Sequence, residues 1–336
     1  MDVSKLLVAW PLAGPCEVSS LSGGTNSLVW RVGAADGQSY VLRITPDSAS
    51  LPRLRYEAAL LHALAEKGLP FLLPLPLRAN SGESIVPFEQ ENGASALVTL
   101  QPFLPGSHPE REDLSSAAEA AISLAALDAA LAALPELPVP DGSQSLTTPG
   151  DLAHWHVLVP DPLAAVEQLP IDRAQSRQIQ SILSTVMGRV SDLYKRLPQQ
   201  LLHRDYCPSN VLMDDHHVTA VLDFEFANMN LRILELAVAL SWWPVNLMGT
   251  GREWSLIDAF GSAYVAHFPL SEEELLALPD ALRLRDATSL VHRIGRYLAG
   301  LETDARMVDR VKHSLWREEW LLANQGTLLQ HVLAWI

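Results

Sequence analysis

Hydrophobic and polar positions divide the chain into a strand-rich first third and a helix-rich remainder. In the first hundred residues, short apolar runs predict strands, and breaks rich in glycine, serine and aspartate separate them. Asp36 and Gly37 form a typical hairpin turn between two of these runs. The predicted strands are Val18–Leu21, Leu28–Val32, Tyr40–Ile44, Ile85–Phe88 and Ala96–Leu100. The pattern therefore predicts a small five-stranded antiparallel sheet.

Helical spacing dominates the rest of the chain. Leu54, Leu61 and Leu64 recur at helical intervals after the third strand, and Gly68 is a plausible end of that helix. A break rich in proline and glycine covers residues 101–113. Beyond it, further helices are predicted at Ser115–Leu134, at Ile171–Arg196 and after Leu231. We therefore expect an α+β protein of two lobes, with domains at residues 1–101 and 102–336.

Composition narrows the class of protein. A chain of 336 residues with 48% hydrophobic and 19% charged residues is typical of a folded protein. Its net charge of −15 argues against nucleic acid or an anionic membrane as a partner. Two cysteines, Cys16 and Cys207, make no disulfide framework. We expect no membrane partner and a cytoplasmic location, because the N-terminus lacks a signal-peptide pattern and no run of about 20 apolar residues appears. The oligomeric state stays open.

The segment HRDYCPSNVLMDDHHVTAVLDFEFA, residues 203–227, concentrates polar groups between two apolar runs. The runs VLM and TAVLDF predict a hairpin, and DDHH is better explained as its solvated turn than as a metal cluster. Asp205 and Asn210 precede the hairpin, and Asp223 ends its second strand. Because a hairpin returns its end close to its beginning, these three side chains are expected to converge. Mg²⁺ prefers oxygen ligands and a hydroxyl nucleophile needs a carboxylate, so the segment predicts phosphoryl transfer.

The motifs in this segment resemble those of known kinases. HRDYCPSN followed by DFE is similar to the protein kinase pattern, although the glycine of D-F-G is absent. Together with Glu235-Leu-Ala, these motifs resemble the aminoglycoside phosphotransferase and choline kinase family, whose usual pattern has glycine at Arg204 and aspartate at Glu235. The stretch DFEFA is most similar to the type II homoserine kinase branch. The resemblance runs from about Val18 to beyond Leu240 and implies a protein kinase-like fold.

The resemblance implies a role for each matching residue of the segment. Asp205 would be the catalytic base, and Asn210 and Asp223 would be the Mg²⁺ ligands. His203 is expected to brace the catalytic loop rather than to take part in the chemistry. Glu225 would either add an acid near the metal or only fix the loop.

ATP would bind to the N-terminal lobe. Arg43 would replace the usual lysine on the third strand as the cation for the phosphates, with Glu57 as its partner. The backbone from Leu100 to Phe103 would meet the adenine edge. A glycine-rich turn lets backbone N–H groups approach phosphates, and its residues here are Gly23, Gly24, Thr25, Asn26 and Ser27.

The resemblance thus implies an ATP- and Mg²⁺-dependent kinase for a small hydroxyl-bearing molecule. Homoserine-like amino alcohols come first as acceptors, then choline or ethanolamine, then aminoglycoside or macrolide antibiotics. A pseudokinase or nucleotide-binding regulator is an alternative that predicts damaged metal ligands, and a purely structural helical protein is another. Helix packing explains Trp242, Trp243, Asp151–His156 and Trp316–Trp320 at least as well as acceptor binding does.

Overall fold

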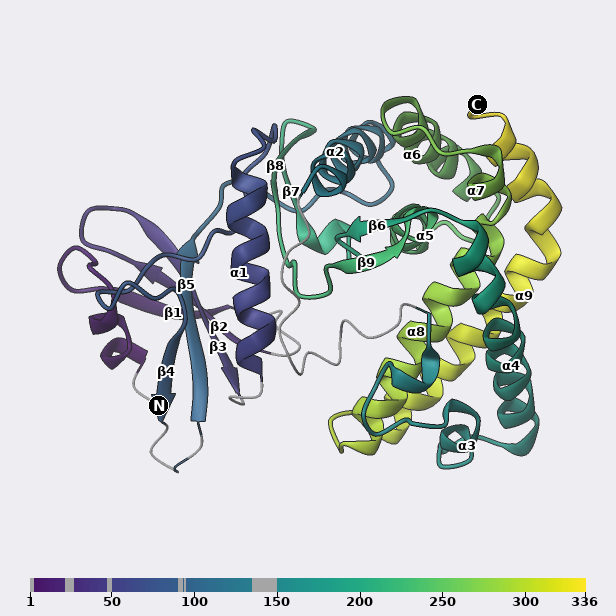
Figure 1. Cartoon of the computed structure of the whole chain (residues 1–336), viewed down its shortest axis with the longest axis horizontal. Coiled ribbons are helices and arrows are strands. Elements are labelled where there is room, and N and C mark those ends of the chain that lie inside the picture. The colour runs from purple at the N-terminus through teal and green to yellow at the C-terminus, as the bar shows by residue number, and fades with distance from the viewer. Residues whose placement is uncertain (1–2, 22–26, 47–49, 90–92, 94, 135–149) are drawn as a thin grey trace. The chain divides into compact units, whose positions relative to one another are not determined.

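The computed structural model describes residues 3–21, 27–46, 50–89, 93, 95–134 and 150–336 (Figure 1). Gly23, Gly24, Thr25 and Asn26 of the glycine-rich turn lie outside these residues. The chain divides into two compact units. The first unit comprises residues 1–107, 133–143 and 211–225, and the second comprises residues 108–132, 144–210 and 226–336.

A five-stranded antiparallel sheet forms the body of the first unit, in the order β1-β2-β3-β5-β4. All five strands confirm the sequence prediction, with boundaries that differ by one or two residues. Leu42, Ile44, Val98 and Leu100 are almost fully buried and form the core of the unit together with residues of the N-terminal segment. The strands are β1 (Glu17–Leu21), β2 (Leu28–Gly33), β3 (Ser39–Pro46), β4 (Val86–Glu89) and β5 (Ser95–Pro102).

The first unit also contains one long helix and two short 3-10 turns. Helix α1 (Leu51–Ala65) follows β3, as the leucine spacing predicts, and Gly68 beyond its end has a φ of +67°. The 3-10 turns η1 (Val3–Lys5) and η2 (Leu7–Ala9) were not predicted. The Trp10 indole that follows them donates to the Leu77 carbonyl at 3.2 Å, which ties the start of the chain to the sheet.

The predicted hairpin is present as β7 (Val211–Asp214) and β8 (His217–Val221), and it belongs to the first unit. Asp215 and His216 form its turn with φ values of +45° and +64°, because two-residue hairpins favour turns with left-handed central residues. The backbone N–H of Val221 donates to the Leu72 carbonyl at 3.1 Å. Val211 pairs with Val221, so the ladder closes one residue after Asn210 and two residues before Asp223.

The second unit is mainly helical, as the sequence predicts beyond residue 113. A short two-stranded sheet of β6 and β9 was not predicted, and β6 leads directly into His203. The helices are α2 (Leu114–Ala132), α3 (Pro162–Val166), α4 (Arg173–Arg196), α5 (Arg232–Trp242), α6 (Glu253–His267), α7 (Glu272–Leu276), α8 (Leu278–Leu298) and α9 (Asp304–Leu333). The remaining elements are η5 (Leu152–His154), η6 (Pro208–Asn210), β6 (Gln199–Leu202) and β9 (Asn228–Leu231).

Helix α2 is the one described helix that is long and apolar enough to cross a membrane by length and composition. Its most apolar window has a mean hydropathy of 1.4, and 56% of that window is buried inside the protein. Ala117, Ala120 and Leu124 are fully buried, and so is Asp128 near the helix end. Burial within the second unit therefore accounts for the apolar composition of this helix.

Candidate active site

The loop that begins at His203 is held from within the second unit. The His203 ring is fully buried, and its Nδ1 accepts the backbone N–H of Asp205 at 3.2 Å. The Tyr206 ring meets the His203 ring edge-on at 6.2 Å, and the Tyr206 hydroxyl donates to the Ala120 carbonyl of α2 at 2.9 Å. These contacts agree with a bracing role for His203.

Asp205 and Asn210 lie together at the two ends of this loop. The Asn210 side-chain Nδ2 donates to Asp205 Oδ2 at 2.8 Å and to the Asp205 carbonyl at 2.9 Å. The backbone N–H of Asn210 donates to the Cys207 carbonyl at 2.8 Å, which closes the turn η6. Because both side-chain hydrogen bonds use Nδ2, the amide oxygen of Asn210 is the atom available to ligate a metal ion.

Arg204 occupies a backbone conformation that favours glycine. Its φ is +68°, which explains why the family pattern has glycine at this position. Its backbone N–H donates to both carboxylate oxygens of Glu235, at 3.0 and 2.9 Å. Its guanidinium donates to Asn228 Oδ1 at 3.1 Å and stacks on the Trp155 ring at 4.6 Å. Glu235 therefore braces the loop although the family pattern has aspartate there.

Glu235 and Asp128 are two fully buried acids in the core of the second unit. Burial raises the pKa of Glu235 to about 7, and the backbone N–H of Arg204 opposes this rise. Burial also raises the pKa of Asp128 well above its usual range, and the charge of Glu235 raises it further. The Tyr264 hydroxyl donates to Asp128 at 2.7 Å. The protonation of Glu235 is therefore linked to the fold of this unit near neutral pH.

Cys207 lies inside the loop but has no nucleophilic character. Burial raises the pKa of its thiol to about 11, and the charge of Asp205 adds to the rise. Its sulfur lies 3.1 Å from the Ser209 hydroxyl. The thiol is therefore protonated at neutral pH.

Arg43 in β3 is the centre of a charge cluster in the first unit. Its Nη1 donates to Glu57 of α1 at 3.0 Å, so the predicted pair is present. Its Nη2 lies 3.9 Å from Glu225, and Arg53 donates to the same Glu225 oxygen at 3.3 Å. Glu225 is thus fixed by two arginines, which supports the reading that it holds its segment in place.

Asp223 belongs to the same cluster. It lies two residues beyond β8 with a φ of +60°, a conformation that aspartate tolerates better than most residues. The charge of Glu57 raises the pKa of Arg43 against the effect of burial, and Asp223 and Glu225 raise it further. The charge of Asp223, a predicted metal ligand, therefore acts on Arg43, the predicted phosphate-binding cation, within the first unit.

The other predicted nucleotide-binding residues are less clearly arranged for that role. The Ser27 hydroxyl lies 3.0 Å from the Thr45 hydroxyl. The Leu100 carbonyl accepts the Leu77 N–H at 2.7 Å, and the Phe103 N–H donates to the Ser39 carbonyl at 2.9 Å. An adenine contact would therefore use the remaining backbone groups of this segment, and it stays a prediction.

The donor set fits Mg²⁺ better than a softer metal. Within the described ranges, no three His, Cys, Asp or Glu side chains gather closely enough to hold a metal ion. The predicted ligands are one amide oxygen, from Asn210, and one carboxylate, from Asp223. Mg²⁺ usually takes only one or two protein ligands and completes its shell with phosphate and water. The residues present therefore suit Mg²⁺ delivered with a nucleotide.

Comparison with known families identifies the chain. The family model described as the phosphotransferase enzyme family matches residues 17–253, which is well over half of the protein. The chain belongs to this family. As a member of it, the protein is an ATP-dependent phosphotransferase that acts on hydroxyl groups of small molecules. Its protein kinase-like fold, an antiparallel N-terminal sheet followed by a mostly helical part, agrees with the prediction.

The known proteins that the chain resembles differ from it at most positions. A homoserine kinase from Phenylobacterium zucineum is 27% identical over 283 residues, which cover 83% of this chain and 79% of that protein. A microcompartment-associated aminopropanol kinase has a TM-score of 0.72 at 14% identity, over 96% of this chain and 98% of that chain. An amicoumacin kinase, solved with AMP-PNP and Ca²⁺, has a TM-score of 0.68 at 15% identity, over 94% and 92% of the two chains. The solved structures share the fold with this phosphotransferase.

Proposed function

We propose that this phosphotransferase transfers the γ-phosphoryl group of Mg²⁺-bound ATP to the hydroxyl of a homoserine-like amino alcohol. Relatives named homoserine kinase support the choice of acceptor over choline, ethanolamine and the antibiotics. The hydrogen bond between Asn210 and Asp205 is the observation that carries the chemical part of the proposal. It orients a carboxylate and leaves an amide oxygen for the metal ion.

The register of the hairpin supports the convergence of the oxygen ligands. Val211 and Val221 are paired. The predicted ligand Asn210 directly precedes Val211, and the predicted ligand Asp223 lies two residues after Val221. The charge of Asp223 in turn acts on Arg43, which would receive the phosphates in place of lysine. The convergence of Asp205, Asn210 and Asp223 on one ion is part of the proposal.

The residues have separate tasks in this mechanism. Asp205 orients the acceptor hydroxyl and accepts its proton as the oxygen attacks the γ-phosphorus and ADP leaves. Arg43 holds phosphate oxygens, and Glu57 fixes the direction of its guanidinium. Asn210 and Asp223 would hold Mg²⁺, which would neutralise charge on the transferred phosphoryl group. Catalysis would depend mainly on positioning, because this transfer needs little covalent chemistry from the protein.

Turnover by the purified protein tests the proposal. ATP consumption would be measured with homoserine, aminopropanol, choline, ethanolamine and representative antibiotics, each with and without Mg²⁺. We expect homoserine to give the highest kcat/KM, and D205N to lower kcat by about 10²- to 10⁴-fold. D214N is the matched control, since Asp214 is an exposed carboxylate at the end of β7.

Two outcomes would contradict the proposal in different ways. Turnover of the acceptor by D205N at the wild-type rate would show that Asp205 is not the base, while leaving the kinase activity in place. Stabilisation of the protein by ATP without turnover of any acceptor would instead favour a nucleotide-binding regulator.

A third variant, N210A, tests the proposed metal ligand. It should raise the Mg²⁺ concentration needed for half-maximal rate without changing the preference for the acceptor.

A further inference from the structure

Arg285 of α8 has an unusual combination of burial and spare hydrogen-bonding capacity. Its side chain is 14% exposed, and its guanidinium stacks on the Trp242 ring of α5 at 4.7 Å. Its Nη1 donates to the neighbouring Asp286 at 2.9 Å. In the described part of the chain this is the only side-chain hydrogen bond of Arg285, so Nε and Nη2 lack a protein acceptor. A mostly buried guanidinium with unused donors is suited to bind an anion.

A chain of contacts fixes the direction of this guanidinium. Asp286 accepts from Arg285 with one oxygen and from Arg317 Nε with the other, at 2.6 Å. Arg317 also donates to the Ser241 hydroxyl at 3.2 Å, and Ser241 precedes Trp242 in α5. Burial alone would raise the pKa of Asp286, but the charges of Arg317 and Arg285 outweigh it and lower the pKa. Asp286 is therefore ionised and holds both arginines in place.

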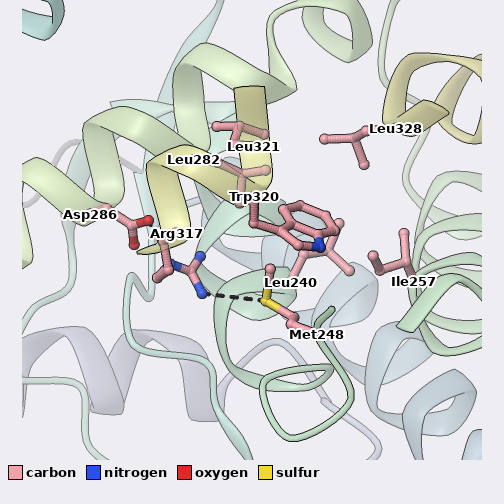
Figure 2. A pocket seen from close by; sticks show the side chains of 9 residues that line it. All are labelled: Leu240, Met248, Ile257, Leu282, Asp286, Arg317, Trp320, Leu321 and Leu328. Carbon is pink, nitrogen blue, oxygen red and sulfur yellow. Dashed lines mark hydrogen bonds and ion pairs between the residues drawn. The ribbon is translucent and has the colours of Figure 1, made fainter. Parts of the chain in front are cut away.

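Figure 2 shows the pocket beside this network, with Arg317 reaching from α9 towards Met248. Apolar side chains such as Leu240 and Trp320 supply most of its lining. Its cavity has a volume of about 20 Å³, which is enough for one water molecule and not for a metabolite. The pocket is therefore a packing gap beside the network, and Arg285 does not line it.

Arg285 is connected to the catalytic loop through helix α5, because it stacks on Trp242 of this helix and Arg204 donates to Glu235 of the same helix. Burial lowers the pKa of Arg285, while the charges of Asp286 and Asp205 act in the opposite direction. Glu235, which anchors the catalytic loop, and Trp242, which carries Arg285, are seven residues apart and share one face of α5. The same face of α5 therefore contacts both the catalytic loop, through Glu235, and the Arg285 guanidinium, through Trp242. In a chain of net charge −15, a local cation favours the binding of an acceptor carboxylate.

We propose that Arg285, stacked on Trp242, binds a carboxylate of the acceptor and so selects hydroxy amino acids over amino alcohols that lack this group. The inference rests on the proposed function and adds a specificity-determining residue to it. Arginine binds carboxylates through two parallel hydrogen bonds, for which Nε and Nη2 have the correct geometry. The aromatic ring keeps the guanidinium plane fixed in the absence of the acceptor.

Homoserine and 3-aminopropan-1-ol form a matched pair for the test, because they differ only in the carboxylate. We expect the wild type to prefer homoserine in kcat/KM. R285Q should lower kcat/KM for homoserine by about 10- to 100-fold, mainly through KM, and change the value for aminopropanol by less than about threefold. R285K should recover part of the preference, since lysine keeps the charge without the two parallel donors.

R283Q is the control for a merely structural effect. Arg283 is on the same helix, and its side chain is 7% exposed. Its Nε donates to both oxygens of Glu318 at 3.0 Å, so its guanidinium is already occupied. R283Q should lower the melting temperature and leave the ratio of the two acceptors unchanged.

Several results would overturn the inference. An unchanged acceptor ratio in folded R285Q would exclude the role, and a rise in KM for ATP alone would assign Arg285 to the nucleotide phosphates. If wild type turns over aminopropanol as well as homoserine, the kinase assignment stands and the carboxylate site is wrong. If no acceptor is turned over, calorimetry with Mg²⁺ and a non-hydrolysable ATP analogue still decides. Tighter binding of homoserine that is lost in R285Q supports the site, and equal binding of both compounds refutes it.

Discussion

The two segments that carry the predicted oxygen ligands are stabilised by different forces. In the first unit, the segment of Asp223 and Glu225 is held by opposite charges, with Arg43 and Arg53 beside the carboxylates. In the second unit, the loop from His203 to Asn210 is held by hydrogen bonds to buried groups, above all to Glu235.

The difference predicts different responses to pH. The charge of Glu57 raises the pKa of Arg43, so this central cation of the first segment stays charged at neutral pH. A buried acid whose pKa is raised towards neutrality changes its charge in that range. The comparison therefore indicates the loop from His203 to Asn210, through Glu235, as a source of pH sensitivity near neutrality.

Removing the central cation of the first cluster should have the largest effect. R43M leaves Glu57 and Glu225 buried without their shared partner, so we expect a loss of about 3 kcal/mol in the free energy of unfolding. It should also lower kcat by about 10²- to 10³-fold at saturating ATP, because an electrostatic contact to the phosphates is lost. Urea unfolding and steady-state kinetics measure the two effects.

R43K and R55Q are the controls for this prediction. Lysine keeps the charge and should restore part of both losses, whereas Arg55 is exposed on α1 and its substitution should change neither quantity. Full activity of R43M would show that charge pairing in the first unit has no catalytic role, and the comparison would then concern stability alone.

The buried acid of the second unit gives the next largest effect. The folded-state pKa of Glu235 is raised to about 7, so the folded protein holds a proton that the unfolded chain releases near its ordinary value. The contribution of this group to stability is therefore fully present at low pH and falls as pH rises from about 4.5 to about 7. E235Q should be more stable than wild type at pH 8, by on the order of 1–3 kcal/mol, and nearly equal to it at pH 5.

Urea unfolding at several pH values checks this sign. A pH-independent difference between E235Q and wild type would show that Glu235 is ionised throughout, and the contrast between the two segments would disappear.

A smaller effect concerns the backbone of Arg204. Both R204A and R204G lose the contacts to Asn228 and Trp155, but only glycine relieves the left-handed φ of +68°. R204G should therefore be more stable than R204A by about 1 kcal/mol. Thermal unfolding of the pair isolates the backbone term, and equal stability would mean that the loop relaxes when its side chain is removed.

The two free cysteines give the smallest effect, since we expect labelling to leave activity unchanged. Cys16 is partly exposed in the first unit, whereas Cys207 is buried in the second with its pKa raised to about 11. Iodoacetamide should modify Cys16 first, and mass spectrometry locates the label. Fast labelling of Cys207 in the folded protein would mean that the loop opens, contrary to the hydrogen bonds that hold it.

Local patterns predicted much of the fold. Hairpin β7–β8 follows from its β-branched runs and polar turn, and the five strands of the sheet follow from alternation and glycine-rich breaks. The strands β6 and β9 did not, because QQLL and NMNL are short, lack strong strand formers and pair across more than twenty residues. Such pairing depends on tertiary contacts that no local window contains.

The site was predictable where a motif carries it. Asp205, Asn210 and Asp223 stand out by spacing, and the Arg43–Glu57 pair follows from the family resemblance. The contacts of Arg53 with Glu225 and of Arg285 with Trp242 could not be predicted, because they join residues that are far apart in the chain. The sequence shows only that arginines and a tryptophan occur in helical segments, and many other positions of the chain have the same property.

Neither compact unit is encoded by one continuous stretch of the gene. The hairpin of residues 211–225 belongs to the first unit but is flanked on both sides by the second. A recombination event that exchanged residues 108–336 with those of a relative would replace the hairpin as well, unless two further crossovers preserved it. Evolution of new acceptors in this architecture should therefore proceed by point substitutions at positions such as Arg285 more readily than by exchange of whole segments.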